Sequence, residues 1–210
     1  MSQILIAVEG IDGSGKSTLV GHIADELRAG GHPVEQLATR EPDKEPVFEA
    51  MVNTYALEPH SPAYMFLFQV LHAHKADRAR KALEEGKVVI TDRWDLSFFA
   101  WHDNFGFFNA ESEELRTGVS RLAFDGLKPT LGIYLDVDVD KAIDRRLWRG
   151  EKIDDPESER QLYTTVVSAY RSLARRHGWI IIDANDGFEG VRDTAWKLVQ
   201  DVVQKITPPG

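Results

Sequence analysis

One short segment near the start of the chain constrains its fold more than any other. Residues 10–17 read Gly-Ile-Asp-Gly-Ser-Gly-Lys-Ser and match the phosphate-binding pattern G-x-x-x-x-G-K-[ST] at every fixed position. An apolar run at residues 4–8 precedes this segment, and an amphipathic stretch at residues 17–28 follows it. A strand, a glycine-rich turn and a helix in this order direct several backbone N–H groups towards one anion. The sequence therefore predicts a P-loop that binds a nucleoside triphosphate.

The side chains of this P-loop predict how the triphosphate is held. We expect Lys16 to reach the β- and γ-phosphates and the hydroxyl of Ser17 to coordinate Mg²⁺. GTPases, motor ATPases and small-molecule kinases all use such a loop, so the acceptor of the phosphate has to be predicted from the rest of the chain. The predicted ATP contacts in the loop are Gly10, Gly13, Ser14, Gly15, Lys16, Ser17 and Thr18.

The alternation of apolar runs along the chain predicts the fold class. Runs typical of buried strands recur at residues 4–8, 34–38, 87–91, 131–135 and 179–182. Helical spacing predicts helices between and after them, at residues 17–28, 62–85, 141–148, 157–176 and 192–205. Strands that alternate with helices form a mainly parallel sheet with helices on both faces. The 210 residues suit one such α/β domain, spanning residues 1–210.

Composition narrows the possible partners. The formal net charge of −9 argues against duplex DNA or an anionic membrane, because both bind broad basic surfaces. The chain contains no cysteine, which excludes disulfides and thiolate metal sites. No apolar run approaches the ~20 residues that span a bilayer, and the first one lacks the basic flank of a signal peptide. We therefore expect a cytoplasmic protein whose partners are small-molecule nucleotides.

Further short motifs follow the P-loop along nearly the whole chain. They are Thr39-Arg40-Glu41-Pro42, Asp92-Arg93-Trp94, Leu135-Asp136-Val137-Asp138, Arg149-Gly150-Glu151 and Ile182-Asp183-Ala184. Together with a P-loop that carries an acidic residue at Asp12, this set resembles the thymidylate kinases, enzymes that phosphorylate dTMP to dTDP. The resemblance implies a P-loop kinase fold with a five-stranded sheet and a short lid at residues 145–156. It also implies ATP as the donor, Mg²⁺ as the metal and a homodimer.

Four residues are predicted to bind the sugar and phosphate of the acceptor and the metal. Asp12 lies within the P-loop, where the resemblance implies contact with the 3′-hydroxyl of the acceptor; a turn-stabilising aspartate is the alternative. Arg93 follows a predicted strand at the edge where open α/β sheets bind ligands, and Arg40 follows the neighbouring strand. Guanidinium groups there can grip the acceptor phosphate. Asp92 suits Mg²⁺ binding through water, although Asp92 and Arg93 can also form a structural salt-bridge cluster.

A cluster of arginines marks the predicted lid. We expect Arg149 to close over the transferred phosphoryl group, where a cation stabilises the developing charge and closure excludes water. Arg145 is assigned to the same lid and to ATP binding, whereas Arg146 is predicted to lie on a solvated helix face. The resemblance adds Asp183 and Ala184 to the ATP site. The predicted catalytic residues are Lys16, Asp12, Arg93 and Arg149.

The predicted base-reading helix departs from the resemblance. The family carries L-F-x-x-x-R on a long helix, where the aromatic ring stacks on the pyrimidine and the arginine reads its oxygens. Here Phe68 is in place, but His72 stands at the arginine position, or Leu71 if the register slips by one residue. Histidine donates or accepts according to its tautomer, so the preference for the base can change. The alternative to base reading is that Phe68 faces the core and His72 is a partly buried residue without contact to the base.

The segment 97–101 departs from the resemblance as well. Trp101 is expected to crowd the ribose 2′ position, Phe98 replaces a small polar residue near the base, and Ser97 completes the predicted acceptor site. The first choice of acceptor is dTMP, and another or modified deoxynucleotide, or a deoxynucleoside, is the alternative. A regulatory NTPase is a third possibility. The arginines predicted to bind the acceptor phosphate, Arg40 and Arg93, argue against it. Residues 103–114 are predicted to be irregular, as a flap or a surface loop.

Overall fold

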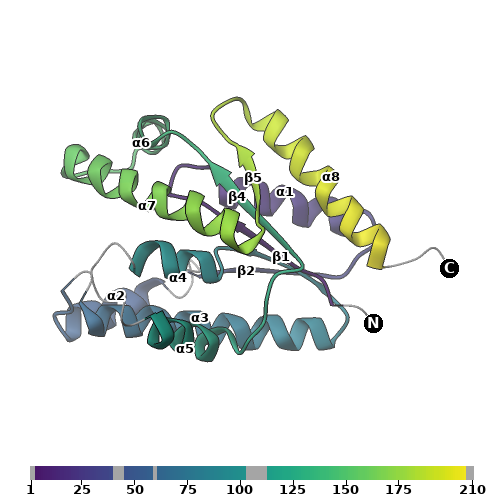
Figure 1. Ribbon diagram of the computed structural model, residues 1–210, viewed down its shortest axis with the longest axis horizontal. Coiled ribbons are helices and arrows are strands. Elements are labelled where there is room, and N and C mark those ends of the chain that lie inside the picture. Colours follow the sequence, from purple (N-terminus) through teal and green to yellow (C-terminus); the bar gives the residue numbers. More distant parts are fainter. Residues whose placement is uncertain (1–2, 40–44, 59–60, 103–112, 207–210) are drawn as a thin grey trace.

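A five-stranded parallel sheet forms the centre of the computed structural model, which describes residues 3–39, 45–58, 61–102 and 113–206 (Figure 1). The strands are β1 (Leu5–Glu9), β2 (Val34–Ala38), β3 (Val88–Asp92), β4 (Leu131–Asp136) and β5 (Ile180–Asp183). They lie in the order β2-β3-β1-β4-β5, and every neighbouring pair is parallel. The predicted α/β fold and all five predicted strands are confirmed.

Strand β1 shows why continuous apolar runs form the centre of this sheet. All five of its residues are buried. Ile6 and Val8 belong to one core cluster, and Leu5 and Ala7 to a second cluster on the opposite face. A strand covered by helices on both faces needs apolar side chains at every position rather than at every second one. The exception is the last residue, Glu9, which is buried where the P-loop begins.

Eight helices connect the strands within the described ranges. They are α1 (Lys16–Ala29), α2 (Glu45–Thr54), α3 (Pro62–Glu84), α4 (Asp95–His102), α5 (Glu113–Phe124), α6 (Val139–Trp148), α7 (Pro156–His177) and α8 (Phe188–Ile206). The predicted helices correspond to α1, α3, α6, α7 and α8, whereas α2, α4 and α5 were not predicted. Because α5 begins at Glu113, the irregular structure predicted for residues 103–114 is wrong at its end; residues 103–112 lie outside the described residues.

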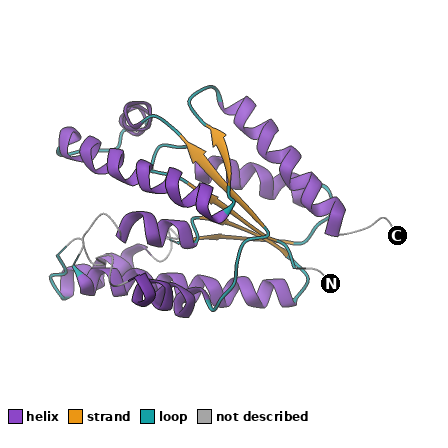
Figure 2. Cartoon of the chain, viewed as in Figure 1, coloured by secondary structure: helices purple, strands orange, loops and turns teal. Residues whose placement is uncertain are grey.

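The helices form two layers around the sheet, as Figure 2 shows. Helices α1 and α8 contact each other and cover one face. Helices α3 and α7 cover the other face, α4 packs on α7, and α5 packs outside on α3 and α4. None of the helices in the described ranges is both long and apolar enough to cross a membrane.

Because the strands are parallel, the predicted motifs that follow them lie at the same side of the sheet, outside the carboxyl ends of the strands. The P-loop follows β1, Arg93 follows β3, and α6 follows β4. Strands β3 and β4 lie on opposite sides of β1, so the connections around β1 diverge to the two halves of the sheet. Open α/β sheets bind their ligands at such a divergence, outside the carboxyl ends of the strands.

Candidate functional site

The glycines of the P-loop allow the loop to curl against α6. Gly10 has φ 150° and Gly13 has φ 87°. A Cβ atom at Gly13 would lie 2.2 Å from the carbonyl oxygen of Ala142 in α6. Any side chain there would push the loop and the helix apart, so glycine is required both by the backbone angle and by the close approach.

The amino end of α1 is arranged to receive an anion. Gly15 precedes the helix with φ 94°, and the first turn has neither a side-chain cap nor an acidic residue. Ser14 is buried, and its hydroxyl has no hydrogen-bond partner among the residues that the structure describes. N–H groups at a helix start that no side chain satisfies, next to a buried hydroxyl, fit the oxygens of a phosphate.

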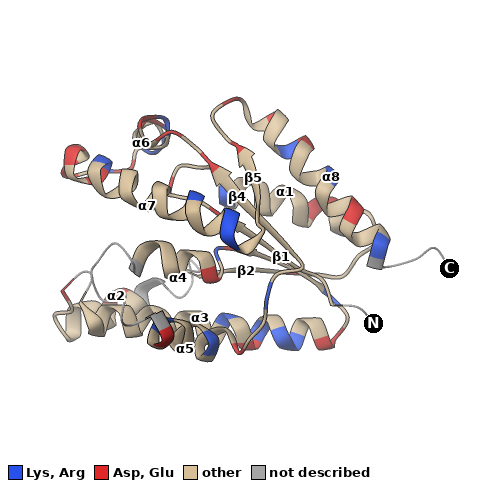
Figure 3. Ribbon diagram, in the orientation of Figure 1, with Lys and Arg blue, Asp and Glu red and all other residues tan. Residues whose placement is uncertain are grey.

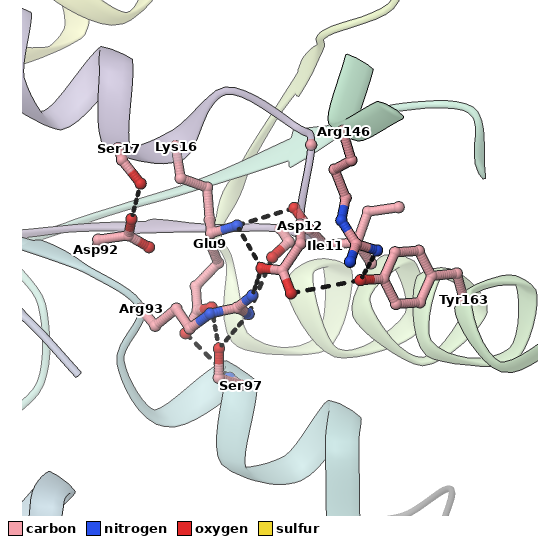
Figure 4. Close-up of polar contacts among 12 residues, drawn as sticks. Glu9, Ile11, Asp12, Lys16, Ser17, Asp92, Arg93, Ser97, Arg146 and Tyr163 are labelled. Carbon is pink, nitrogen blue, oxygen red and sulfur yellow. Dashed lines mark hydrogen bonds and ion pairs between the residues drawn. The ribbon is translucent and has the colours of Figure 1, made fainter. Parts of the chain in front are cut away.

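Lys16, Asp12 and Arg93 meet beside this helix end (Figure 4). The Lys16 ammonium donates to the carbonyl oxygen of Ile11 at 2.8 Å and lies 3.7 Å from the Asp12 carboxylate. The same carboxylate accepts a hydrogen bond from the Arg93 guanidinium. Burial acts to raise the pKa of Asp12, but the charges of Arg93 and Lys16 outweigh it and hold that pKa below its usual range. The carboxylate therefore stays ionised at neutral pH.

Arg93 joins the carboxyl end of β3 to the P-loop. One of its terminal nitrogens donates to the carbonyl oxygen of Gly10 at 3.0 Å, to the Tyr170 hydroxyl at 3.1 Å and to the Ser97 hydroxyl at 3.2 Å. Its backbone has φ 68°, in the left-handed region, which costs a residue with a side chain roughly 1–2 kcal/mol. Strain of this size persists only where the surroundings hold the residue in place, and such positions cluster at functional sites.

A buried carboxylate, Glu9, ties three elements together beneath Arg93. It accepts hydrogen bonds from the backbone N–H groups of Trp94 at 2.7 Å and Ser97 at 3.0 Å. The hydroxyls of Ser97 and Tyr170 also donate to it, at 2.5 Å and 3.2 Å. Burial raises the pKa of Glu9, and the charge of Arg93 and these hydrogen bonds partly offset the rise. The start of α4 and the middle of α7 are thereby fastened to the end of β1.

Ser17 and Asp92 provide the oxygen pair predicted for the metal. The Ser17 hydroxyl donates to a carboxylate oxygen of Asp92 at 2.5 Å. Hydroxyl and carboxylate oxygens are hard ligands of the kind that Mg²⁺ takes. Among the described residues no group of three or more His, Asp or Glu side chains could hold a metal ion. A Mg²⁺ ion here would depend on phosphate oxygens and water for its other ligands, which is how Mg²⁺ is usually bound beside nucleotides.

Arg145 connects the P-loop to the loop after β5. Its guanidinium donates to the carbonyl oxygens of Ala184 at 2.9 Å, Gly13 at 3.4 Å and Asp186 at 3.4 Å. Asp183 accepts from the backbone N–H of Asn185 at 2.9 Å and so shapes the same loop. The predicted ATP residues Arg145, Asp183 and Ala184 are thus brought to the P-loop. Thr18, the last of the ATP contacts predicted in the P-loop, lies exposed in the first turn of α1.

The prediction that Arg146 lies on a solvated face is wrong. Its side chain is only 13% exposed. It donates to the Tyr163 hydroxyl at 2.8 Å and also bonds Glu159. Tyr163 in turn donates to Asp12 at 3.3 Å, so Arg146 reaches the centre of the site through one side chain (Figure 4).

Arg149, the predicted lid residue, lies further out. Its side chain is 48% exposed and donates to Glu151 at 2.5 Å. Glu151 also accepts from Arg146 at 2.7 Å. Arg149 lies three residues after Arg146, at the C-cap of α6, and so stands about one turn further from the P-loop. A run of charged residues does not reveal which of them faces inward.

The predicted acceptor residues are distributed over two environments. Trp101 lies beside the centre, with its ring edge-on to Tyr163 and the Arg93 guanidinium 5.8 Å from its ring centroid. Phe68 is half-buried in α3 and packs against Tyr64 and Phe48.

His72 and Phe98 lie deeper than Trp101. Both are buried; His72 packs against Phe124, and Phe98 belongs to the core cluster that contains Phe124. Ser97 lies in the Glu9 network described above. Arg40 lies outside the described residues.

Sequence reasoning missed three members of the site: Glu9, Tyr163 and Tyr170. The two tyrosines lie on α7, seven residues apart, and therefore share one face of the helix. Their partners Asp12 and Glu9 are 151 and 161 residues away in the sequence. Only Glu9 leaves a local signal, as an acidic residue that ends an otherwise apolar strand.

Comparisons with known proteins agree in pointing to one family. The family model described as thymidylate kinase matches residues 8–195. The chain is 32% identical to the thymidylate kinase of Thermomicrobium roseum, over 95% of this chain and 96% of the relative. It is 30% identical to that of Halothermothrix orenii, over 98% and 100%, and 30% identical to that of Synechococcus sp. (strain CC9902), over 97% and 100%.

Proposed function

Because this chain belongs to the thymidylate kinase family, we propose that its P-loop site transfers the γ-phosphate of ATP to dTMP. The products are dTDP and ADP. An oxygen of the acceptor phosphate forms a bond to the γ-phosphorus, and the bond from that phosphorus to the β–γ bridging oxygen breaks. The chemistry requires little covalent participation from the protein, so the task of the site is to position two anions and stabilise the charge between them.

The meeting of Lys16, Asp12 and Arg93 carries this proposal. Lys16 belongs to the loop that would hold the donor, and Arg93 to the strand end that would hold the acceptor. Asp12 bonds both cations, and so brings the two sides together at one point. A phosphate-binding loop without an acceptor, as in a regulatory NTPase, has no need of such a junction.

Arg93 has N–H donors available to bind an acceptor phosphate. Its contacts with Gly10, Ser97, Tyr170 and Asp12 use the two terminal nitrogens. None of its hydrogen bonds to the described residues uses Nε. A guanidinium has five N–H donors, so the edge formed by Nε and the neighbouring terminal nitrogen can bind two phosphate oxygens at once. We assign this edge to the phosphate of dTMP, with help from Arg40.

Metal binding is assigned to Ser17, with Asp92 in support through water. Mg²⁺ bound there would neutralise charge on the β- and γ-phosphates during transfer. The Ser17 hydroxyl, which donates to Asp92 here, can turn a lone pair outward without moving the carboxylate. Asp92 can then order a water in the coordination sphere.

Arg146 and Arg149 are assigned to the charge on the transferred group. Arg146 is already directed inward, next to Tyr163. Arg149 would have to leave Glu151 and close over the phosphates. Cations that approach a transferring phosphoryl group act most strongly once water is excluded.

The thymine and the sugar are assigned to Phe68, Trp101 and Asp12. Phe68 supplies a half-buried aromatic face for stacking, and Trp101 lies beside Arg93, where a bulky ring can disfavour a ribose 2′-hydroxyl. The Asp12 carboxylate can accept the 3′-hydroxyl. His72 and Phe98 are assigned to the walls behind the base, because both are almost fully buried.

We further propose that the protein acts in the cytoplasm as a homodimer built on α3 and α5. Four apolar side chains on these helices are mostly exposed: Phe66 (57%), Val70 (62%), Leu115 (62%) and Leu122 (83%). The first half of α3 carries no Lys, Arg, Asp or Glu, as Figure 3 shows. Apolar side chains that gather on neighbouring helices favour association with another protein surface.

A panel of acceptors tests the proposed reaction. ATP consumption is measured with each deoxy- and ribonucleoside monophosphate and with thymidine. We expect kcat/KM to be highest for dTMP, to be lost when Mg²⁺ is chelated, and to be lost in Lys16→Met. Lys197→Met, which changes an exposed lysine on α8, serves as the matched control. ATP consumption without any acceptor, or a higher kcat/KM for a different acceptor, would contradict the proposal.

A further inference from the structure

A second buried lysine lies close to Arg93, and no part of the reaction described above uses it. Lys75 in α3 is 2% exposed. Its Nζ donates to the Thr39 hydroxyl at 2.7 Å and to the carbonyl oxygen of Arg93 at 2.6 Å, and lies 5.2 Å from the ring centroid of Trp94. An ammonium taken out of water is costly unless its donors are satisfied. A methionine or leucine could fill the same volume without that cost, so the lysine calls for an explanation.

Lys75 connects the three segments that carry the predicted acceptor residues. Thr39 directly follows β2 and precedes Arg40. Arg93 directly follows β3. Lys75 itself lies seven residues after Phe68, so both side chains project from one face of α3. One amino group therefore connects the helix that would hold the base to the two strand ends that would hold the phosphate.

The hydrogen bond to Arg93 reaches its backbone and leaves the guanidinium to other partners. The carbonyl oxygen of Arg93 accepts from Lys75 and from the Thr91 hydroxyl at 3.1 Å, while its N–H donates to the carbonyl oxygen of Val8 at 2.9 Å. The backbone between these anchors has φ 68°. A left-handed residue with a side chain is held by its neighbours. A small rotation of this peptide would move the guanidinium at the far end of the side chain by a larger distance.

We propose that Lys75 is a positioning residue for the acceptor: it fixes the backbone of Arg93 and the residue after β2, Thr39, against α3, without touching either nucleotide. The inference rests on the acceptor role proposed for Arg93. It predicts a selective effect, because the contacts of Lys75 involve the acceptor side of the site and none of them involves the P-loop.

Steady-state kinetics of Lys75→Met test this selectivity. Methionine keeps an unbranched apolar side chain but removes the donors. We expect the KM for dTMP to rise about 10- to 100-fold, in line with the cost of misplacing a binding group by about 1 Å, while the KM for ATP stays within about twofold of the wild-type value. Lys81→Met, on an exposed position of the same helix, is the matched control and should behave as the wild type in both measurements.

The absence of cysteine from the chain permits a sharper test. Lys75→Cys introduces a unique thiol, which can be alkylated in the unfolded protein before refolding. The reagent 2-bromoethylamine restores an amino group, with its N–H donors, at nearly the original distance, and 1-bromopropane gives a group of the same length without donors. We expect the aminoethyl adduct to recover the wild-type KM for dTMP and the propyl adduct to resemble Lys75→Met. Should Lys75→Met fail to fold, Thr39→Val removes one acceptor of the Lys75 hydrogen bonds at nearly constant volume, and it should raise the KM for dTMP while leaving the KM for ATP unchanged.

Each other outcome has a clear meaning. An unchanged KM for dTMP in Lys75→Met, equal recovery by the two adducts, or a parallel rise in both KM values would show that Lys75 only fills space, and would overturn the inference. Wild-type protein that does not phosphorylate dTMP in the same assay would instead overturn the proposed function. The two failures are therefore distinguishable.

Discussion

At the scale of single residues, the site depends on which of several similar side chains points inward. Arg145, Arg146 and Arg149 lie within five residues, yet Arg145 bonds backbone carbonyls, Arg146 bonds Tyr163, Glu159 and Glu151, and the side chain of Arg149 bonds Glu151 alone among the described residues. Arg145 and Arg146 differ because each residue turns the side chain by about 100° around the helix axis, whereas Arg149 differs because it lies past the end of α6, one turn beyond Arg145. The effect of substituting one of these arginines therefore does not predict the effect of substituting another.

Replacing Arg146 and Arg149 one at a time should separate their roles. We expect Arg146→Ala to lower kcat by roughly 10³-fold, as loss of an arginine that neutralises a transferring phosphoryl group does, with little change in the KM for dTMP. Arg149→Ala should lower kcat by a similar factor if closure of the lid brings it to the phosphates. Pre-steady-state and steady-state rates at saturating substrates measure both effects.

An exposed arginine provides the control for this pair. Arg28→Ala, on α1 and paired with Asp25 at the surface, should leave kcat unchanged. A normal kcat in Arg146→Ala would restrict that residue to a structural role. A rise in KM alone for Arg149→Ala would move that residue from the lid to the binding site.

At the scale of elements, the sequence predicts what is local and repetitive. Five strands and five helices were predicted because their apolar residues recur with the period of the element. Helix α4 was missed because Asp95 to His102 is short and mostly apolar, and in such a run helical and extended spacing cannot be told apart. Helix α5 was missed although Leu115, Val119 and Leu122 follow helical spacing.

For the site as well, the sequence predicted the contiguous segment but not the contacts between distant residues. The P-loop is contiguous, so its residues could be recognised directly from the sequence. The Glu9 network joins residues up to 161 positions apart, and Arg146 was assigned to solvent because its partners lie on α7. The contacts that complete the site are tertiary, and no local pattern encodes them.

The attachment of α3 to the sheet predicts a dependence of stability on pH. Burial lowers the pKa of Lys75 to about 7 from an ordinary value of 10.5, and the negative charges of Glu9, Asp92 and Asp95 offset part of the effect, against the charge of Arg93. Between these two pH values the unfolded chain binds more protons than the folded one, so a rise in pH favours folding. The stability contributed by Lys75 is therefore present above its unfolded pKa and lost as the pH falls towards 7.

Urea unfolding at several pH values between 7 and 9.5 measures this effect. The free energy of unfolding of the wild type should rise, relative to that of Lys75→Met, by up to about 1.4 kcal/mol per pH unit. The difference between the wild type and Lys81→Met should stay constant, because Lys81 is exposed. A pH-independent difference for Lys75→Met as well would show that its pKa is not lowered in the folded state.

At the scale of the whole molecule, α3 has one buried face and one exposed apolar face. Phe68, His72 and Lys75 are directed towards the site and the core, while Phe66 and Val70 are exposed on the other side. A partner that binds the exposed face would press on the helix that holds the acceptor. Association and acceptor binding are then expected to depend on each other.

A charged substitution on the exposed face tests the predicted homodimer. Sedimentation velocity of the wild type at micromolar concentration should give twice the mass of the chain, and Val70→Glu should reduce it to a monomer, because burying an unpaired carboxylate in an apolar interface is unfavourable. Leu147→Glu, at another exposed apolar residue, should remain dimeric. A monomeric wild type would refute the homodimer.

The buried Glu9 carboxylate also has a consequence for the time at which the site becomes complete. Glu9 stands directly before the P-loop and is synthesised before its partners Ser97 and Tyr170, which follow 88 and 161 residues later. Until α7 has been synthesised, the carboxylate lacks part of its hydrogen bonding, and Asp12 lacks Tyr163. Contacts this distant in the sequence form late in folding. The most recognisable motif of the chain is therefore made well before α7, yet it acquires its full surroundings only once α7 has been translated.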